Sequence, residues 1–522
     1  MSLKQQVSPR TEVDEKMSAL ITNANAVRAI ASAVEGTLGP KGLDTMLVDR
    51  FGEVVITNDG VTILTMMEAN HPAAKMLINI AKSQQDEIGD GTTTATVMAG
   101  ALVGSGVNQV AKGVPVARVI EGLRAGLSRA RQLIQAQSVV LEGVNKPQIR
   151  QVALVAGREH QDIADLVVGA AGLIGEEKLK DKGFKLADTV LAEEGANNQV
   201  FMGVVIDKEP MNKQMPKDLQ NVKVLVVDDA LEPEEIEEES LATEAGFARY
   251  LDLQNEFRAN LQKVIELGVG LVLVDRGVDD TAEELFTDAG IMVLQRVPHR
   301  ELQKAAEHCG ARMIKRTGLK KSPENLAKYL GNAKDVKTEE QLEQVWIMEG
   351  GGKPLATILV GAATAEVVGE RQRIAKDAAA AVQAAVRGGL VPGGGALELA
   401  VAREVEKLRE EMRGMAAFGV DCVVDALKRP MSQIVANAGY NPLEKLGDVN
   451  ANQVEQGKNS LGIDCDTGEN KDMLDLGVVD PTLVKIHALK AAGEIAEAIL
   501  RIDTIIKMRD EKNNGLDHGL EP

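Results

Sequence analysis

The chain has 522 residues, of which 44% are hydrophobic, 26% charged and only 2% aromatic. These proportions are typical of a soluble globular protein with aliphatic cores, and the length predicts about three domains. With 59 basic and 78 acidic residues the net charge is −19, which argues against nucleic acid or an anionic membrane surface as a partner. No apolar run could span a bilayer and the N-terminus has no signal-peptide core, so we expect a cytoplasmic protein.

The cysteines, histidines and short motifs argue against several chemistries. Cys309, Cys422 and Cys465 are odd in number and far apart, which disfavours a disulfide framework. The six histidines form neither HExxH nor a Cys–His zinc pattern, and there is no Gly-x-Ser-x-Gly elbow. Walker A and GxGxxG motifs are also absent, which disfavours a P-loop and a dinucleotide-dependent oxidoreductase.

The first third is predicted to be a helical bundle with one β-hairpin. Apolar residues three and four apart indicate a helix from Met17 to Val34 that ends at Gly36. The hairpin is expected over 46–48 and 53–57. Further helices are expected at 63–67, 72–88, 92–111 and 115–137, the last with Pro115 at its first helical position.

The run Gly89-Asp90-Gly91-Thr92-Thr93-Thr94 is the strongest functional signal. Its glycines let the backbone turn and approach a ligand, and hydroxyl groups at a helix start add donors to free N–H groups that favour phosphate. A carboxylate beside phosphate needs a cation between them, so Asp90 suggests Mg²⁺. For one threonine an ordinary helix cap is the simpler interpretation, but three behind Gly-Asp-Gly favour a phosphate site.

Two other segments of the first third allow two interpretations each. The loop Thr37-Leu38-Gly39-Pro40-Lys41-Gly42 is a turn more often than a phosphate loop. Asp59 lies in Asn58-Asp59-Gly60, which is strong turn chemistry. The alternative is that Asp59 is a second carboxylate of the Asp90 site and positions a metal or a water.

The middle third changes character twice. Its pattern is helical from 145 to 174 and strand-like over 186–190 and 200–206. From residue 207 a separate α/β domain is predicted, with strands near 223–227, 270–274, 290–294 and 311–314 and helices over 247–267 and 299–308. The acidic run from Leu231 to Ser240 is a solvated face or a protrusion, or else an arm that contacts a partner.

The last third returns to the earlier pattern. A strand near 355–361 precedes a helix from Glu366 to Arg387, where Asp377 lies among alanines and either orients a water or is simply exposed on the polar face. The glycine-rich segment 388–395 is a ligand loop or a hinge. A helix over 396–412, helices to 438, turns at 462–468 and 476–481, a final helix from Thr482 to Arg509 and a polar tail over 510–522 complete the chain.

Several motifs resemble the chaperonin family in matching order. They are Leu38-Gly39-Pro40-Lys41-Gly42, Thr57-Asn58-Asp59-Gly60, Gly89-Asp90-Gly91-Thr92-Thr93-Thr94, Gly393-Gly394-Gly395 and Leu476-Gly477-Val478-Val479-Asp480-Pro481. Three more resemble the thermosome and CCT (group II) branch: His71-Pro72-Ala73-Ala74-Lys75, Met215-Pro216-Lys217 and Ile499-Leu500-Arg501-Ile502-Asp503. The similarity covers nearly the whole chain, and the pattern also fits the bacterial group III offshoot of that branch.

The resemblance implies a multidomain α and α/β fold. A mainly helical equatorial ATP-binding domain would comprise residues 1–141 and 392–522. A small α+β intermediate hinge domain would comprise 142–206 and 357–391. An α/β apical client-binding domain would comprise 207–356, with a built-in lid near 230–250.

The resemblance also implies roles for individual residues, with ATP and Mg²⁺ as the bound species. Asp90 would hold Mg²⁺, and Gly91, Thr92, Thr93 and Thr94 would bind the β- and γ-phosphates. Leu38, Gly39 and Pro40 would line the α-phosphate, while Gly394, Val478 and Asp480 would hold the adenosine, Asp480 at the ribose. Asp377 and Asp59 would position the attacking water. Asp377 would be the base, on a hinge segment that must fold down before hydrolysis.

One departure from the family lies around Arg158. The branch usually has a longer loop there, with a lysine that senses the γ-phosphate. In this chain the loop is short and Arg158 takes that position, as a fork of donors rather than a compact point charge. The apical segment matches the family weakly, so the resemblance assigns no client contacts.

The implied function is an ATP-driven folding chamber that encloses non-native protein clients. Its subunits would form a homo-oligomeric ring, expected to be eight-fold and either single or double, closed by the built-in lid without a separate co-chaperonin. The alternative is a ring-forming scaffold or holdase with little ATP turnover. The presence of Asp59, Asp90 and Asp377 speaks against that alternative.

Overall fold

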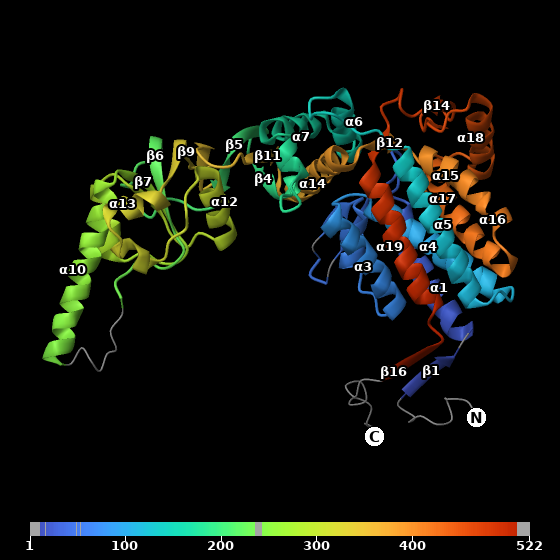
Figure 1. Cartoon of the computed structure of the whole chain (residues 1–522), viewed down its shortest axis with the longest axis horizontal. Helices are drawn as coiled ribbons and strands as arrows, with labels where there is room; N and C mark the ends of the chain where they lie inside the picture. Colours follow the sequence, from blue (N-terminus) through green and yellow to red (C-terminus); the bar gives the residue numbers. More distant parts are fainter. Residues whose placement is uncertain (1–10, 16, 49, 53, 235–242, 509–522) are drawn as a thin grey trace, which may run out of the picture. The chain divides into compact units, whose positions relative to one another are not determined.

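The computed structural model describes residues 11–508 except 16, 49, 53 and 235–242 (Figure 1). The contacts among these described residues divide the chain into two compact units. Unit 1 combines Met1–Ala164 with Arg373–Pro522, and unit 2 is Asp165–Gln372. The chain therefore leaves unit 1 and returns to it, while the finer division into three domains stays a prediction.

Unit 1 is a bundle of long helices around α4 (Thr92–Ala111). Its neighbours are α1 (Met17–Glu35), α3 (Pro72–Glu87), α17 (Ala417–Asn437) and α19 (Thr482–Leu500), and α5 (Val116–Ala136) lies beside α17 and α19 (Figure 1). Small residues allow this close packing. A Cβ on Gly100 would lie 2.7 Å from Ala31 of α1, and one on Gly106 would lie 2.7 Å from Leu500 of α19. The predicted helix over 92–111 is confirmed at both ends.

Shorter elements surround this bundle. They are β1 (Thr11–Glu15), β2 (Thr45–Val48), β3 (Val54–Thr57), α2 (Gly60–Met66), α6 (Pro147–Ala156), β12 (Leu390–Pro392), α15 (Ala396–Glu406), α16 (Leu408–Glu411), η5 (Gly414–Ala416), α18 (Pro442–Gln456), β13 (Leu461–Ile463), β14 (Asn470–Asp472), β15 (Val479–Pro481) and β16 (Thr504–Met508). The pairs β1–β16, β2–β3, β12–β15 and β13–β14 each form a two-stranded sheet. The β2–β3 pair is the predicted hairpin.

Unit 2 is built on one eight-stranded sheet. In sheet order the strands are β4 (Val190–Glu194), β11 (Ala356–Ala362), β5 (Gln199–Ile206), β10 (Gln344–Gly350), β9 (Gly331–Glu339), β6 (Asp218–Val227), β7 (Val269–Val274) and β8 (Met292–Leu294). The last three are parallel and are joined by α10 (Glu244–Glu266) and α11 (Asp280–Asp288), as βαβ crossovers require. This arrangement confirms the predicted alternation of strands and helices.

The remaining elements of unit 2 are α8 (Glu176–Lys180), η2 (Leu186–Thr189), α12 (His299–Cys309), η3 (Arg316–Lys320), α13 (Pro323–Leu326) and η4 (Ala327–Tyr329). Two helices contain the boundaries between the units: α7 (Gln161–Ile174) and α14 (Ala365–Gly388). None of the described helices combines the length and apolar character that a membrane span requires.

Several local predictions were wrong. The final helix ends at Leu500 rather than 509, because the β-branched residues that follow form β16 and pair with β1. The helix expected over 396–412 breaks at Lys407, and Pro115 caps α5 instead of occupying its first turn. The strand expected over 186–190 begins as the 3-10 helix η2, and that over 311–314 is a single bridge from Ile314 to Val227.

Other segments were missed or lie outside the described residues. Strands β9 and β10 were not anticipated, although their register with β5 and β6 makes them the centre of the sheet. The polar tail 510–522 and residues 235–242 of the acidic run and lid are outside the described residues.

Candidate functional site

The loop between α3 and α4 is shaped by two glycines. Gly89 and Gly91 have φ of +84° and +78°, the left-handed region that other residues avoid. A Cβ on Gly89 would lie 2.4 Å from the Cβ of Ala380 in α14, and one on Gly91 would lie 2.5 Å from Val484 in α19. Glycine is therefore required both for the turn and for close packing against two sequence-distant helices.

The N-terminus of α4 carries no side-chain cap. Its capping residue is Gly91, and among the described residues no side chain accepts a hydrogen bond from the first N–H groups. The threonines thus do not serve as the ordinary cap that a helix start would suggest. The buried Thr92 instead directs its hydroxyl toward Asp59, and Thr96 bonds to the carbonyl of Thr92. Uncapped N–H groups at the positive end of a 20-residue helix suit an anionic ligand.

Asp90 provides negative charge beside these N–H groups. Its Oδ1 accepts a hydrogen bond from the Gly91 N–H at 2.6 Å. Burial and the nearby charge of Asp480 raise the pKa of Asp90 to about 6, while Gly91, Lys485 and Arg158 act in the opposite direction. Two neighbouring carboxylates of this kind provide hard oxygen donors. These donors fit Mg²⁺.

A buried glutamine fixes the loop from beneath. Gln84 of α3 donates from Nε2 to the carbonyl of Asp90 at 2.7 Å and to that of Val484 at 3.4 Å. Its Oε1 lies 2.7 Å from Nδ1 of His487 in α19. Because Gln84 is fully buried, these bonds are shielded from water and hold the loop against α19.

Asp59 lies in the turn that its sequence predicted and also approaches the start of α4. It caps α2, with its carboxylate accepting from Val61 N at 3.3 Å, Thr62 N at 3.0 Å and Thr62 Oγ1 at 2.6 Å. The same carboxylate also lies 3.5 Å from Thr92 Oγ1. The turn at Asp59 therefore packs directly against the start of α4.

Arg158 and Asp377 meet across the same region. The guanidinium of Arg158 lies 3.7 Å from a carboxylate oxygen of Asp377, and both side chains are mostly buried. Arg158 and Glu159 both have positive φ, at 52° and 65°, just after α6 ends. Short loops that hold two non-glycine residues in this region are strained, which commonly accompanies a fixed functional position.

A third part of the site is formed by β12, β15 and the glycines that follow β12. Val391 pairs with Asp480, and Gly393 N donates to the carbonyl of Val478 at 2.9 Å. A Cβ on Gly393 would lie 3.1 Å from Oδ2 of Asp480, while one on Gly394 would meet Met473. The glycines therefore lie directly against Asp480 and Val478.

The same corner holds two residues that the sequence analysis missed. Lys485 of α19 lies 2.6 Å from Asp480 and 2.5 Å from Glu398 of α15. The sequence does contain a signal for Lys485 and Glu398, since each is a single charged residue within an apolar helical stretch. Lys485 was the stronger signal, because a cation in the first turn of a helix opposes the dipole.

The loop Leu38–Pro40 is positioned by α17. Asn437 donates to the carbonyl of Leu38 at 2.8 Å, and Gly39, with φ of +87°, leaves room for Ile434. Hydrogen bonds, ion pairs or the effect of one charge on another thus connect most of the predicted site residues. These are Asp59, Asp90, the start of α4, Arg158, Asp377 and Asp480. The loop Leu38–Pro40 instead contacts α17. The roles of all these residues stay predictions.

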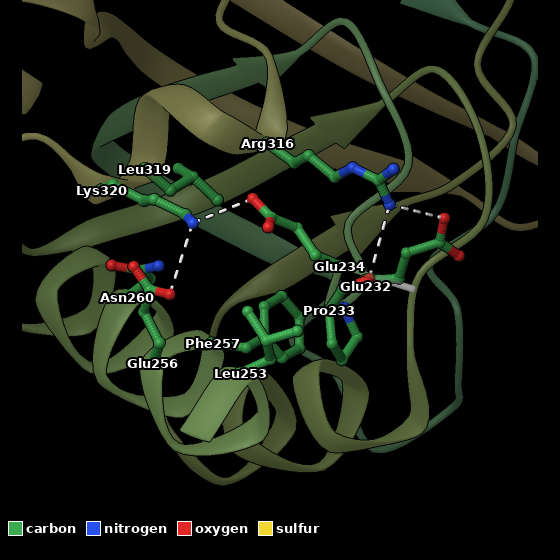
Figure 2. A pocket seen from close by; sticks show the side chains of 10 residues that line it. All are labelled: Glu232, Pro233, Glu234, Leu253, Glu256, Phe257, Asn260, Arg316, Leu319 and Lys320. Carbon is green, nitrogen blue, oxygen red and sulfur yellow. Dashed lines mark hydrogen bonds and ion pairs between the residues drawn. The ribbon is translucent and has the colours of Figure 1, made fainter. Parts of the chain in front are cut away.

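Unit 2 contains a separate recess at the base of α10 (Figure 2). Its floor is apolar, with Leu253 and Phe257 of α10, Leu319 and Pro233. Two ion-pair groups flank it in Figure 2: Arg316–Glu232 at 3.0 Å, and Lys320 with Glu234 at 2.9 Å and Glu256 at 3.3 Å. In the described part of the acidic run, Glu232 and Glu234 thus form ion pairs with other residues of unit 2 while remaining partly exposed.

Comparisons with known proteins agree on one family. The model of the "TCP-1/cpn60 chaperonin family" matches residues 30–510. A thermosome subunit of Pyrococcus horikoshii is 34% identical, covering 96% of this chain and 93% of its own length. The thermosome subunit alpha of Thermoplasma acidophilum is 33% identical, with 95% and 93% covered.

A solved structure extends the comparison to the fold. The crystal structure of a group III chaperonin in the open state is 49% identical, with a TM-score of 0.85 over 94% of this chain and 99% of that chain. The multidomain α and α/β fold expected from the motifs is therefore confirmed, as is the resemblance to the group II and group III branches.

Proposed function

The chain belongs to the TCP-1/cpn60 chaperonin family and is an ATP-dependent chaperonin, and from this premise we propose how its site binds and cleaves the nucleotide. The observation that carries the proposal is the electrostatic surrounding of Asp90. Arg158, at the end of α6, and Asp480 and Lys485, near the start of α19, act on this one carboxylate from two parts of the sequence that are both distant from Asp90. Such convergence next to an uncapped helix N-terminus is typical of a phosphate site.

The phosphates would bind at the start of α4. The free N–H groups of the first turn and the hydroxyls of Thr92, Thr93 and Thr94 donate to the β- and γ-phosphate oxygens, while Gly91 allows the approach. Asp90 would hold Mg²⁺, which neutralises phosphate charge when it is bound. Leu38, Gly39 and Pro40 would line the α-phosphate.

The adenosine would lie at the β12–β15 corner. Gly394 and Val478 form its surface, and Asp480 accepts hydrogen bonds from the ribose hydroxyls. The glycines that follow β12 support this placement, because without side chains they allow a ligand to approach the backbone beside Asp480.

Asp377 would act as the base that takes a proton from the attacking water, with Asp59 orienting that water. Arg158 would donate to the γ-phosphate. Its contact with Asp377 supports a linked role, because a guanidinium that turns toward phosphate releases the carboxylate for the water. Arrival of the γ-phosphate would in this way activate the base.

Nucleotide turnover would drive closure of a folding chamber around non-native proteins. We propose a homo-oligomeric ring, eight-fold and single or double, with the lid formed by the segment near 230–250. The β2–β3 hairpin supports assembly, since it exposes Met46, Val48 and Ile56, and Phe51 at its tip is 91% exposed. Apolar surface of this kind is typical of an interface with another subunit.

The substitution Asp377→Ala tests the chemistry. It should leave Mg-ATP binding within a few-fold of the wild type and lower turnover about a hundredfold or more, as expected when a general base is lost. Equilibrium binding and steady-state phosphate release are measured on the assembled protein. Asp448→Ala, an exposed aspartate of α18, is the matched control and should retain turnover.

Turnover of Asp377→Ala within about twofold of the wild type would remove Asp377 from the mechanism. If the wild type itself bound ATP without hydrolysing it while still suppressing client aggregation, the holdase alternative would hold. ATP-dependent refolding of a denatured client, measured alongside phosphate release, separates a working chamber from a holdase.

A further inference from the structure

A buried ion network lies behind the proposed ribose end of the site. Lys485 is 8% exposed and its ammonium contacts two carboxylates, Asp480 at 2.6 Å and Glu398 at 2.5 Å. Glu398 is only 1% exposed, and its second oxygen, Oε2, has no hydrogen-bond partner among the described residues. Three charged groups this close and this dry are costly to desolvate and are not explained by stability alone.

The network is built so that the lysine remains charged. Burial disfavours the ammonium, but the charges of Asp480 and Glu398 outweigh it and the pKa of Lys485 is raised. Glu398 lies in the first turn of α15, where the helix dipole favours a carboxylate. Lys485 lies in the first turn of α19, where the dipole opposes it, so its position is held by its two partners.

Lys485 contacts one of the two carboxylate oxygens of Asp480, which matters for ligand binding. Lys485 engages Oδ2 of Asp480, and a Cβ on Gly393 would lie 3.1 Å from the same oxygen. Within the described part of the chain, no hydrogen bond or ion pair engages Oδ1. The partly exposed Asp480 therefore has one oxygen fixed by the protein and the other free to accept hydrogen bonds.

We propose that Lys485, anchored by Glu398, is a positioning residue that orients the Asp480 carboxylate and so makes the site selective for nucleotides with intact ribose hydroxyls. This inference rests on the proposed function of the site as a nucleotide site. Without the lysine, Asp480 would be free to rotate, and its preference for a ribose over a deoxyribose would fall. A carboxylate hydrogen bond that is lost on removing a hydroxyl corresponds to a tenfold or larger difference in affinity.

The test is equilibrium binding rather than turnover. ADP, 2′-deoxy-ADP and 3′-deoxy-ADP are titrated with Mg²⁺ into the assembled protein by calorimetry. The wild type should bind ADP about tenfold or more tightly than at least one deoxy analogue. Asp480→Asn should abolish most of that ratio.

The decisive variant is Lys485→Met combined with Glu398→Gln. It keeps the side-chain volumes and removes the two most deeply buried charges. Of the three groups only Asp480 is left as a carboxylate without its ion-pair partner, and it is partly exposed. The ratio should fall to within about twofold of unity while ADP itself still binds. Lys490→Met, an exposed lysine on the same helix, is the matched control and should keep the wild-type ratio.

The outcomes separate the inference from the function beneath it. If the double variant is folded and keeps the wild-type ratio while Asp480→Asn loses it, Lys485 does not position Asp480. If the wild type discriminates against neither analogue, Asp480 does not recognise the ribose and the inference fails with it. If the wild type does not bind ADP at all, it is the proposed nucleotide site that is wrong.

Discussion

Replacing Gly89 by alanine should disrupt the contact between the phosphate loop and α14. The new Cβ would lie 2.4 Å from the Cβ of Ala380, whereas carbon atoms in ordinary contact are about 3.5–4.0 Å apart. Ala380 follows Asp377 by three residues on the same helix, so the two share a face of α14. Moving this contact would therefore move the proposed base relative to the phosphates.

The expected destabilisation has two parts. Holding alanine at φ of +84° costs about 1–2 kcal/mol, and forcing a methyl group into a filled space costs about 1–3 kcal/mol more. Gly89→Ala should thus lower the free energy of unfolding by about 2–5 kcal/mol. Ala380→Gly alone should cost about 1–2 kcal/mol, from helix propensity and one lost methyl group.

The double variant Gly89→Ala with Ala380→Gly isolates the steric part. Because it removes the opposing methyl group, it should be more stable than the sum of the single effects predicts, by about 1–3 kcal/mol. Urea unfolding followed by the circular dichroism of the helices measures this at one fixed subunit concentration. The fluorescence of Trp346 is unsuitable, since this residue lies in unit 2. Additive effects, or a Gly89→Ala variant as stable as the wild type, would refute the described packing.

Two further predictions concern other parts of the chain. In unit 2, burial lowers the pKa of His308, whose Nε2 accepts from Gly350 N at 2.9 Å, so the neutral ring is favoured on folding. The contribution of His308 to the free energy of unfolding should be complete above pH 6.5 and should decline as the pH falls toward the lowered pKa. The variant His308→Gln should therefore lose less of its free energy of unfolding than the wild type between about pH 7.5 and 5.5. Unfolding is followed by the fluorescence of Trp346. In unit 1, both carboxylate oxygens of Asp59 accept backbone N–H groups, so Asp59→Asn, which turns one oxygen into a donor, should lower the free energy of unfolding by about 1–2 kcal/mol. It should also lower ATP turnover about tenfold or more if the carboxylate orients water. Unchanged turnover would leave Asp59 with its capping role alone.

The helices of unit 1 could be predicted because their signals are local. Apolar spacing and flanking glycines define α1 and α4 without reference to the rest of the chain. The region Gly89–Thr94 was found for the same reason, since its turn and its helix start are adjacent in sequence. Where a strand also depends on a distant partner, the local pattern was insufficient: β16 pairs with β1, and the β9–β10 hairpin is completed by β6 and β5.

Arg158 and Asp377 were each predicted as site residues, but the contacts that assemble the site join distant segments and were not predicted. The Arg158–Asp377 pair joins the end of α6 to α14, and the Lys485–Glu398 pair joins α19 to α15. A lysine within an apolar helix shows only that something neutralises it, not which carboxylate does. His299 gives another instance, because it belongs to no metal-binding motif but lies 3.1 Å from Asp228 in the folded unit.

The place of the Arg158–Asp377 pair in the chain suggests how chemistry and conformation could be linked. The chain passes between the two units within α7, which begins three residues after Arg158, and within α14, which carries Asp377 shortly after the boundary. Each partner of the pair is therefore connected through a helix to unit 2. If unit 2 moves as a body, the two helices provide a route by which that movement could change the distance between guanidinium and carboxylate. The contact that we propose to release the base when the γ-phosphate binds thus lies close, along the chain, to both passages between the units.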